Sequence, residues 1–294
     1  MNKTSTKYNA RLVAAAFKFY GCTRVVIAPG SRNAPLINAF AADDTFELIS
    51  APDERSAAFI AMGHTLNGQP AAVCCSSGSA LVNFYPAVVE AYYQKLPLVV
   101  LSADRPTEGI DQGIGQTIRQ QNVFANHINH SSNLVREPHD ELSKRFNQRQ
   151  VSEAFLSFPG PIHINVPFDE PLYDTTEEVQ DDFRFIQGFA NSNALSDKSF
   201  ALLKELWERS PKKLMLAGQM NIHYELMETL NKLDAVTPFI TFSETVSNMA
   251  NGGHNIKNID RLINTLDEEG KRDLQPDLLI TIGGDVVSKM VKKY

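Results

Sequence analysis

The chain has 294 residues, of which 43% are hydrophobic and 21% charged, a balance typical of a soluble globular protein rather than a disordered, fibrous or membrane-embedded one. Its formal net charge of −6 argues against a general nucleic-acid or anionic-membrane surface, because such surfaces need a broad positive field. At roughly 150 residues per domain, the length predicts about two domains.

The first part of the chain alternates helical patterns with short β-rich runs. In chain order we expect helix 6–20, strand 24–30, helix 33–42, strand 46–50, helix 53–66, strand 71–77, helix 79–94, strand 96–104, helices 115–126 and 138–157, and strand 160–167. The strands are continuous apolar runs, as in parallel strands that helices cover on both faces. Residues 1–180 are therefore predicted to form an α/β domain with a doubly wound parallel sheet.

The segment 174–198 is acidic and polar and mostly lacks periodic apolar spacing, which predicts a linker. The alternation then resumes with helix 198–209, strand 212–218, helix 222–233, strand 237–242, helix 258–267, strand 277–284 and the start of a final helix. Three strands make half of a nucleotide-binding sheet. We therefore expect residues 195–294 to form a truncated, Rossmann-like domain.

Cysteine usage and hydropathy indicate where the protein resides. The chain has three cysteines, Cys22, Cys74 and Cys75, and no C-x-x-C motif. An odd number of cysteines without this motif favours a protein of the reducing cytoplasm that has no structural disulfides. No stretch approaches 18 uninterrupted apolar residues, and the N-terminus lacks a continuous signal-peptide core, so we expect neither a membrane span nor a secretory leader.

Candidate site residues follow the predicted strands, because ligands of open parallel sheets bind beyond the carboxyl ends of the strands. Four such segments should meet at one edge: 28–33, 51–56, 76–83 and 102–120. In the first, Ser31 and Arg32 precede a helix and fit an anion site. The same sequence is also compatible with a serine that only caps the helix and an arginine that is simply solvated. Arg105 and Gln116 in the last segment add polar groups, so we expect a pocket for an acid with several carboxylates.

The second and third segments suggest chemistry on a ring. Glu54 begins an apolar helix, where it serves either as an ordinary first-turn acid or as a desolvated carboxyl group with a raised pKa that shares a proton with a ring nitrogen. Ser77, Gly78 and Ser79 form a small-residue turn that lets a planar ligand approach the backbone, and also suit a plain strand-to-helix turn. No metal ligands are predicted, because the spacing His127-x-x-His130 lacks a third ligand.

The set of motifs resembles a known family. APGSRNAPL (28–36), DERSAAFIAMGHTL (53–66), SSGSALVNFYPAVVEAY (76–92), LPLVVLSADRP (96–106), QTIRQ (116–120) and GPIHINVPFDEPL (160–172) are similar to the N-terminal half of the 2-succinyl-5-enolpyruvyl-6-hydroxy-3-cyclohexene-1-carboxylate synthases, thiamine-diphosphate enzymes of menaquinone biosynthesis. The resemblance is close over residues 1–175 and looser over 195–294.

The resemblance implies a subunit with a pyrimidine-binding domain, a central Rossmann-like domain and a diphosphate-binding domain. The diphosphate-binding domain, which would hold thiamine diphosphate through Mg²⁺, is expected to be absent from this chain, because no G-D-G occurs in it. This chain alone would then be an inactive fragment. The family decarboxylates 2-oxoglutarate and adds the resulting carbanion equivalent to isochorismate, and it forms homodimers or homotetramers.

The resemblance also assigns roles to individual residues. Glu54 matches the glutamate that contacts the aminopyrimidine ring of the cofactor and promotes the tautomer that removes the thiazolium C2 proton. The matching substrate-binding positions are Ser31, Arg32, Arg105 and Gln116, and Lys289 is similar to a basic substrate contact from the central domain. Two other readings stay open: another thiamine-diphosphate 2-oxo acid decarboxylase, and a non-catalytic module that binds a carboxylate metabolite.

Overall fold

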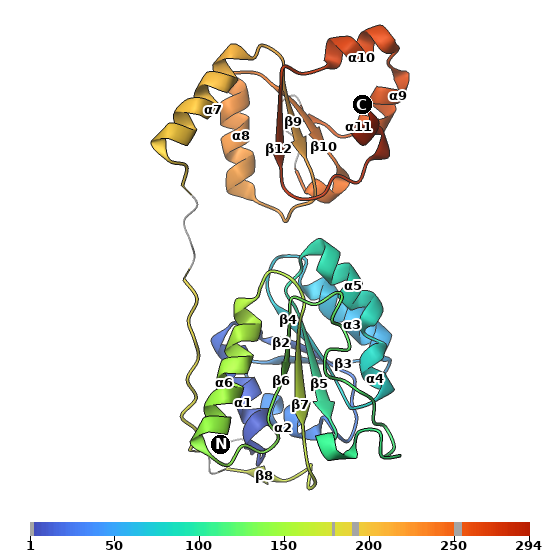
Figure 1. The fold of residues 1–294 in the computed structure, drawn as a ribbon, viewed down its shortest axis with the longest axis vertical. Helices are drawn as coiled ribbons and strands as arrows, with labels where there is room; N and C mark the ends of the chain where they lie inside the picture. Colours follow the sequence, from blue (N-terminus) through green and yellow to red (C-terminus); the bar gives the residue numbers. More distant parts are fainter. Residues whose placement is uncertain (1–2, 178–179, 190–193, 250–254) are drawn as a thin grey trace. The chain divides into compact units, whose positions relative to one another are not determined.

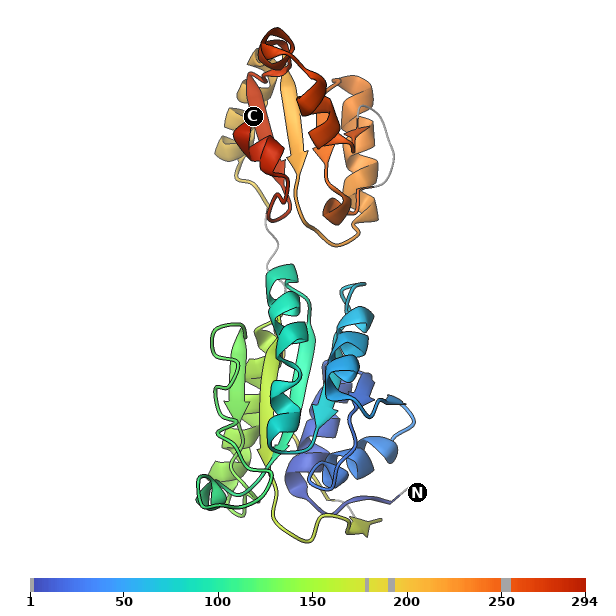
Figure 2. The ribbon, with the colours of Figure 1, turned by 90° about the vertical axis from the view of Figure 1, so that its right-hand side faces the viewer.

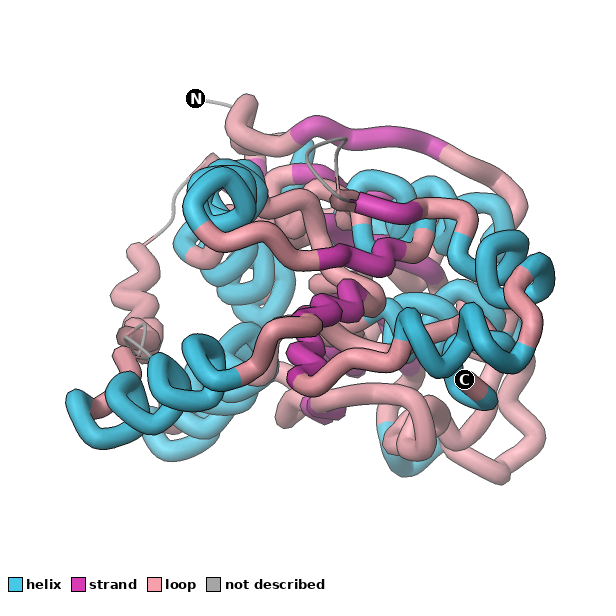
Figure 3. The backbone as a smooth tube through the Cα atoms, turned by 90° about the horizontal axis from the view of Figure 1, so that it is seen from above, coloured by secondary structure: helices cyan, strands magenta, loops and turns pink. Residues whose placement is uncertain are grey.

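The computed structural model describes residues 3–177, 180–189, 194–249 and 255–294, and the chain divides into two compact units, residues 1–189 and 190–294 (Figure 1). The boundary between the units falls inside the segment 174–198. In both units the strands lie between helices (Figure 1), and Figure 3 colours the helices, strands and loops. No helix in the described part of the chain has the length and apolar character needed to cross a membrane.

The first unit contains a six-stranded parallel sheet in the order β3-β2-β4-β5-β7-β6. The strands are β2 (Arg24–Ile27), β3 (Glu47–Ser50), β4 (Ala71–Cys75), β5 (Leu98–Asp104), β6 (His130–Asn133) and β7 (Ile162–Pro167). All were predicted as strands except β6, an edge strand whose sequence HSSN carries no apolar signal.

Helices cover both faces of this sheet (Figures 1 and 2). One face packs against α1 (Tyr8–Phe19), α2 (Ala34–Ala41) and α6 (Glu141–Leu156), and the other against α3 (Glu54–His64), α4 (Ser79–Val82) and α5 (Tyr85–Gln94). Successive strand residues alternate between the two cores: Val25 and Cys74 face the first, and Val26 and Cys75 the second. The predicted doubly wound α/β fold is therefore confirmed.

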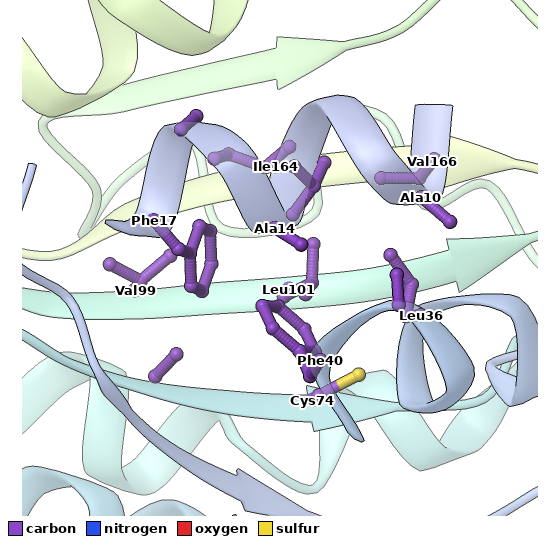
Figure 4. Close-up of a cluster of buried hydrophobic side chains, with 14 of the residues drawn as sticks. Ala10, Ala14, Phe17, Leu36, Phe40, Cys74, Val99, Leu101, Ile164 and Val166 are labelled. Carbon is purple, nitrogen blue, oxygen red and sulfur yellow. The ribbon is translucent and has the colours of Figure 1, made fainter. Parts of the chain in front are cut away.

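The first core is dense and aromatic. Figure 4 shows Phe17 of α1 and Phe40 of α2 beside Val99 and Leu101 of β5. The Phe17 and Phe40 ring centroids are 5.2 Å apart, and both side chains are fully buried. Burying each such ring stabilises the fold by roughly 1.5–3 kcal/mol, so α1 and α2 are fixed firmly on the sheet that carries the site.

Two predicted helices of this unit are wrong in detail. Residues 115–126 form turns rather than a helix, and Gln116 and Asn122 have φ of +56° and +59°, values that a right-handed helix excludes. The predicted helix 79–94 is broken after Val82 into α4 and α5, with a proline at the start of α5.

The predicted linker is also wrong over most of its first half, because the described residues 175–177 and 180–186 contact the first unit. β8 (Thr175–Thr176) pairs antiparallel with β1 (Thr4–Ser5), and the Arg11 guanidinium forms an ion pair with Asp181, with Nε and Oδ2 2.7 Å apart. The Tyr20 hydroxyl then donates to the Ile186 carbonyl at 2.7 Å. Residues 178–179 and 190–193 of the predicted linker lie outside the described residues.

The second unit has a four-stranded parallel sheet in the order β11-β10-β9-β12. Its strands are β9 (Lys213–Ala217), β10 (Ile240–Ser243), β11 (Asn255–Ile256) and β12 (Leu278–Ile282). The helices are α7 (Asp197–Arg209), α8 (Tyr224–Val236), α9 (Ile259–Thr265), α10 (Glu268–Leu274) and α11 (Lys289–Lys293). Strand β11 and helix α10 were not predicted, and β10 begins later than predicted because α8 extends to Val236.

Candidate functional site

The connections of the first sheet place its ligand-binding edge between β2 and β4. The chain runs from β2 outward to β3, then returns past β2 to β4 and continues to β5 on the other side. Ligands of doubly wound sheets bind at the carboxyl ends of the strands, at the point where the strand order reverses. The two loops at this point, 28–33 and 76–78, both carry predicted site residues.

The loop after β2 holds its own shape. Asn33 accepts a hydrogen bond from the Gly30 N–H at 2.9 Å and donates to the Ala28 carbonyl at 3.0 Å. These contacts fix the turn that carries Ser31, which is exposed, and Arg32, which is buried. The interpretation of Arg32 as an ordinary solvated side chain is therefore wrong.

Arg32 is 5% exposed, and its guanidinium group has both protein partners and a free donor. Nη1 donates to the Phe168 carbonyl at 3.1 Å, and Nη2 lies 3.0 Å from Glu170 Oε1. Its Nε is buried without a partner, and so is Nε of Arg105. Burial lowers the pKa of Arg32, and the nearby charge of Arg105 lowers it further.

The two arginines therefore form a cationic pair at the sheet edge. Placing two guanidinium groups close together in a partly buried site is unfavourable unless anions compensate them; Glu170 pairs directly with Arg32, and the charges of Asp169 and Asp104 also act on it. Each unpartnered Nε–H is a donor of the kind that carboxylates bind. The arrangement is thus chemically suited to an anionic ligand.

The loop after β4 lies directly against the loop after β5. Gly78 has φ of +85°, and a Cβ at this position would lie 2.9 Å from the Gln116 backbone, so only glycine fits. The Ser77 hydroxyl donates to the Gln116 carbonyl at 2.9 Å. Ser79 is exposed and begins α4. The predicted turn and Gln116 are thus neighbours, and the Gln116 backbone occupies the space where a side chain at position 78 would lie.

Glu54 is the first residue of α3, and the helix is capped by its neighbour. The Asp53 carboxylate accepts a hydrogen bond from the Ser56 N–H at 2.7 Å, which leaves Glu54 without a capping role. Hydrogen bonding to the Ser56 side chain and backbone lowers the pKa of Asp53. Glu54 is half-buried, and its charge adds to the effect of burial and of Cys74 in raising the pKa of the Cys75 thiol at the end of β4. The Glu54 carboxylate therefore lies close to the carboxyl end of β4, whereas its predicted full desolvation stays a prediction.

Lys289 belongs to the second unit. It is the exposed first residue of α11, which Ser288 caps through a hydrogen bond from the Val291 N–H at 3.0 Å. The Glu244 carboxylate accepts hydrogen bonds from the Val287 and Ser288 backbone amides and holds the loop before α11. The first unit gathers the other predicted site residues at one edge, and Lys289 remains a separate prediction.

Three polar residues at this edge were not singled out from the sequence: Asp104, Asn165 and Glu170. Asp104 and Asn165 are buried, and Asn165 Nδ2 donates to Asp104 Oδ2 at 2.7 Å. Burial raises the pKa of Asp104. A signal was present, because Asp104 ends β5 and Asn165 and Glu170 lie in or just after β7, so all three obey the rule applied to the other loops.

A cleft of about 350 Å³ opens at the carboxyl ends of β5 and β7, and Asp104, Gln120 and Asn133 are among its lining residues. Its position beside the loop that carries Gln116 makes it part of the same edge. No group of three or more histidine, cysteine, aspartate or glutamate side chains with the geometry of a metal site occurs in the ranges that the structure describes.

Comparisons with known proteins show what the chain is similar to. Residues 9–131 match the family model "Thiamine pyrophosphate enzyme, N-terminal TPP binding domain". Over 99% of its length the chain is 41% identical to a protein of Bacteroides thetaiotaomicron named 2-succinyl-5-enolpyruvyl-6-hydroxy-3-cyclohexene-1-carboxylate synthase, of which it covers 53%. Over 93% of its length the chain is 41% identical to a protein of the same name from Flavobacterium johnsoniae, and it covers 49% of that protein.

A third relative of the same name, from Cytophaga hutchinsonii, is 39% identical over 94% of this chain, and the chain covers 50% of that relative's length. The chain thus spans about half the length of the curated relatives that it matches. The resemblance expected from the sequence motifs is confirmed, and it extends through the second unit as well as the first.

Proposed function

We propose that this chain is the N-terminal part of a 2-succinyl-5-enolpyruvyl-6-hydroxy-3-cyclohexene-1-carboxylate synthase. The whole protein would be a transferase of menaquinone biosynthesis that decarboxylates 2-oxoglutarate with thiamine diphosphate and joins the remaining four-carbon unit to isochorismate. Identity of 39–41% to relatives of that name, over nearly the whole chain, supports this proposal. The observation that carries it is the pair of buried, unpartnered Nε atoms of Arg32 and Arg105.

The cofactor's ring end fits the edge between β2 and β4. The small residues of the turn after β4, Ser77, Gly78 and the exposed Ser79, would lie against the ring. Glu54, free of the capping role, would hold a proton at its carboxyl group against a ring nitrogen. When bound, thiamine diphosphate supplies the electron sink for cleaving and forming carbon–carbon bonds.

The substrate end fits the arginines. Both proposed substrates carry two carboxylates, and Arg32 and Arg105 offer two buried Nε–H donors beside the exposed hydroxyl of Ser31. A charge-assisted hydrogen bond of this kind is worth roughly 1.5–3 kcal/mol. Gln116 and, from the second unit, Lys289 would complete the contacts. The Arg32–Glu170 pair holds one guanidinium edge in place while the other receives the ligand.

The proposal also includes Mg²⁺, a homodimer or homotetramer, and a cytoplasmic location. The ligands of Mg²⁺ and the diphosphate would come from the part of the longer protein outside this chain. Apolar side chains that are exposed on and near α3 and α4 support an association surface next to Glu54: Phe59, Ile60, Leu66 and Val82.

The test is product analysis by mass spectrometry on the full-length protein that contains this chain, supplied with thiamine diphosphate, Mg²⁺, 2-oxoglutarate and isochorismate. Formation of the condensation product supports the proposal. Release of CO₂ from 2-oxoglutarate without incorporation of isochorismate would identify a different decarboxylase. Binding of the acids without turnover would identify a carboxylate-binding module.

Substitution of Glu54 tests the role of its carboxyl group. We expect Glu54→Gln to retain the fold and lose activity by several orders of magnitude, because the amide can neither take up nor release the proton. Glu269→Gln is the matched control, since Glu269 is an exposed glutamate in the first turn of α10. Full activity of Glu54→Gln would overturn the assigned role.

A further inference from the structure

A buried hydrogen-bond relay joins the Gly78 turn to the strand end that carries Arg105. Its central residue is Gln120, which is fully buried. Gln120 Oε1 accepts the Gly78 N–H at 2.7 Å, and Nε2 donates to the Ala103 carbonyl at 3.1 Å and to Asn165 Oδ1 at 2.8 Å. Every polar atom of this amide is therefore used.

The relay continues from Asn165 to the arginine. Asn165 Nδ2 donates to Asp104 Oδ2 at 2.7 Å and to Asn133 Oδ1 at 2.6 Å. Asp104 Oδ1 in turn accepts the Arg105 N–H at 2.7 Å. An unbroken series of side-chain contacts thus runs from the backbone of Gly78 to the backbone of Arg105.

The polarity of the relay fixes which side chain can occupy position 120. That side chain faces a donor, the Gly78 N–H, on one side and two acceptors, the oxygens of Ala103 and Asn165, on the other. A glutamine satisfies both sides, whereas a carboxylate would set negative oxygens against the two acceptors. A protonated carboxyl group would restore one of the two donor contacts.

We propose that Gln120 is a positioning residue that sets the Gly78 turn for the cofactor's ring end and ties it to Arg105. The proposal rests on the proposed function and adds a residue to that site. Gln120 acts through Gly78 and Asn165 and does not need to touch the reacting atoms. Removing it should weaken cofactor binding more than it weakens the fold.

The charged and titratable groups around the relay are few and fixed. Burial lowers the pKa of His163 to about 3, so its imidazole stays neutral at ordinary pH, and Ser102 separates it from Asn165. The other groups that face the relay or the adjoining turn are Asp104, Arg105, Arg32, Cys75 and Glu54. All of them are common to the wild-type protein and the variants, so a new pH dependence in a variant reports on position 120.

The test uses Gln120→Glu and Gln120→Met in the full-length protein. Gln69→Glu is the control, since Gln69 is exposed in the loop before β4, at the amino end of that strand. Thiamine diphosphate binding is measured by calorimetry between pH 5.5 and 8. We expect Gln120→Glu to bind the cofactor about 10- to 100-fold more weakly at pH 8 and to recover part of that loss at pH 5.5. Gln120→Met, which has no hydrogen-bonding head, should be weak at both pH values.

A second measurement separates this inference from the proposed function. Hydrogen exchange at the Gly78 amide, read without cofactor or substrate, should be faster in Gln120→Met, which removes the acceptor of that amide, and unchanged in Gln69→Glu. Cofactor affinity that is equal in wild type and both variants would overturn the positioning role, and so would a loss in Gln120→Glu that does not depend on pH. Absence of synthase activity in the wild type would instead overturn the proposed function.

Discussion

Gly30 lies so close to Ser76 that a Cβ at position 30 would be 2.6 Å from the Ser76 Cβ. This contact joins the loop after β2 to the loop after β4, the two loops at the point where the strand order reverses. The arginine loop and the Gly78 turn are therefore held as one rigid edge. The spacing between them is set by the absence of a side chain at a single residue.

Substitution at this contact should be costly. Gly30→Ala forces two loop backbones apart, and we expect a loss of about 1–3 kcal/mol in the free energy of unfolding, measured by urea denaturation. Gly63→Ala is the matched control, because Gly63 lies in α3 and a Cβ there meets no atom within 4 Å. That change should stabilise the helix by about 0.5–1 kcal/mol. Equal effects of the two changes would show that the Gly30 contact is not tight.

The cationic edge can be tested by a change that keeps its charge. Arg32→Lys retains the positive charge but loses Nε and the fork that binds Phe168 and Glu170 together. We expect KM for 2-oxoglutarate in the full-length protein to rise about 10- to 100-fold. In the control, Arg24→Lys, the altered arginine forms an exposed ion pair with Glu47, and KM should not change. An unchanged KM in Arg32→Lys would remove Arg32 from the substrate site.

His163 should make the fold sensitive to acid. Its pKa is lowered by burial to about 3, below the ordinary value of 6.5, so below pH 6.5 the unfolded chain gains a proton that the folded chain refuses. The stability that this residue contributes is complete above pH 6.5 and is lost as the pH falls towards 3, by roughly 1.4 kcal/mol for each pH unit.

His163→Gln should therefore flatten the decline in unfolding free energy between pH 6.5 and 4.5, as measured by urea denaturation at several pH values. His139→Gln is the control, since His139 is exposed. A decline of the same slope in wild type and His163→Gln would show that His163 is not buried as a neutral group.

The sequence predicted the fold class because parallel strands that are buried on both faces consist of continuous apolar runs, such as AAVCC in β4. It failed where tertiary contacts replaced local pattern. QTIRQQNVFANH has helical spacing, yet Gln120 and Phe124 are buried as single anchors of a turning loop with left-handed residues between and before them. The packing of Phe183 and Phe185 on the first core was missed because both residues stand in an acidic segment.

What the sequence determined by itself was the set of residues at the strand ends, since a strand's apolar run fixes where its loop begins and parallel strands open on one edge. Only the tertiary structure decided which partners those residues contact. It pairs Arg32 with Glu170, places Gly30 against Ser76, and forms the hydrogen-bond relay through Gln120 and Asn165. These contacts join residues 45 to 138 positions apart. Local pattern carries no record of such pairs, because they arise only when the sheet brings the strand ends together.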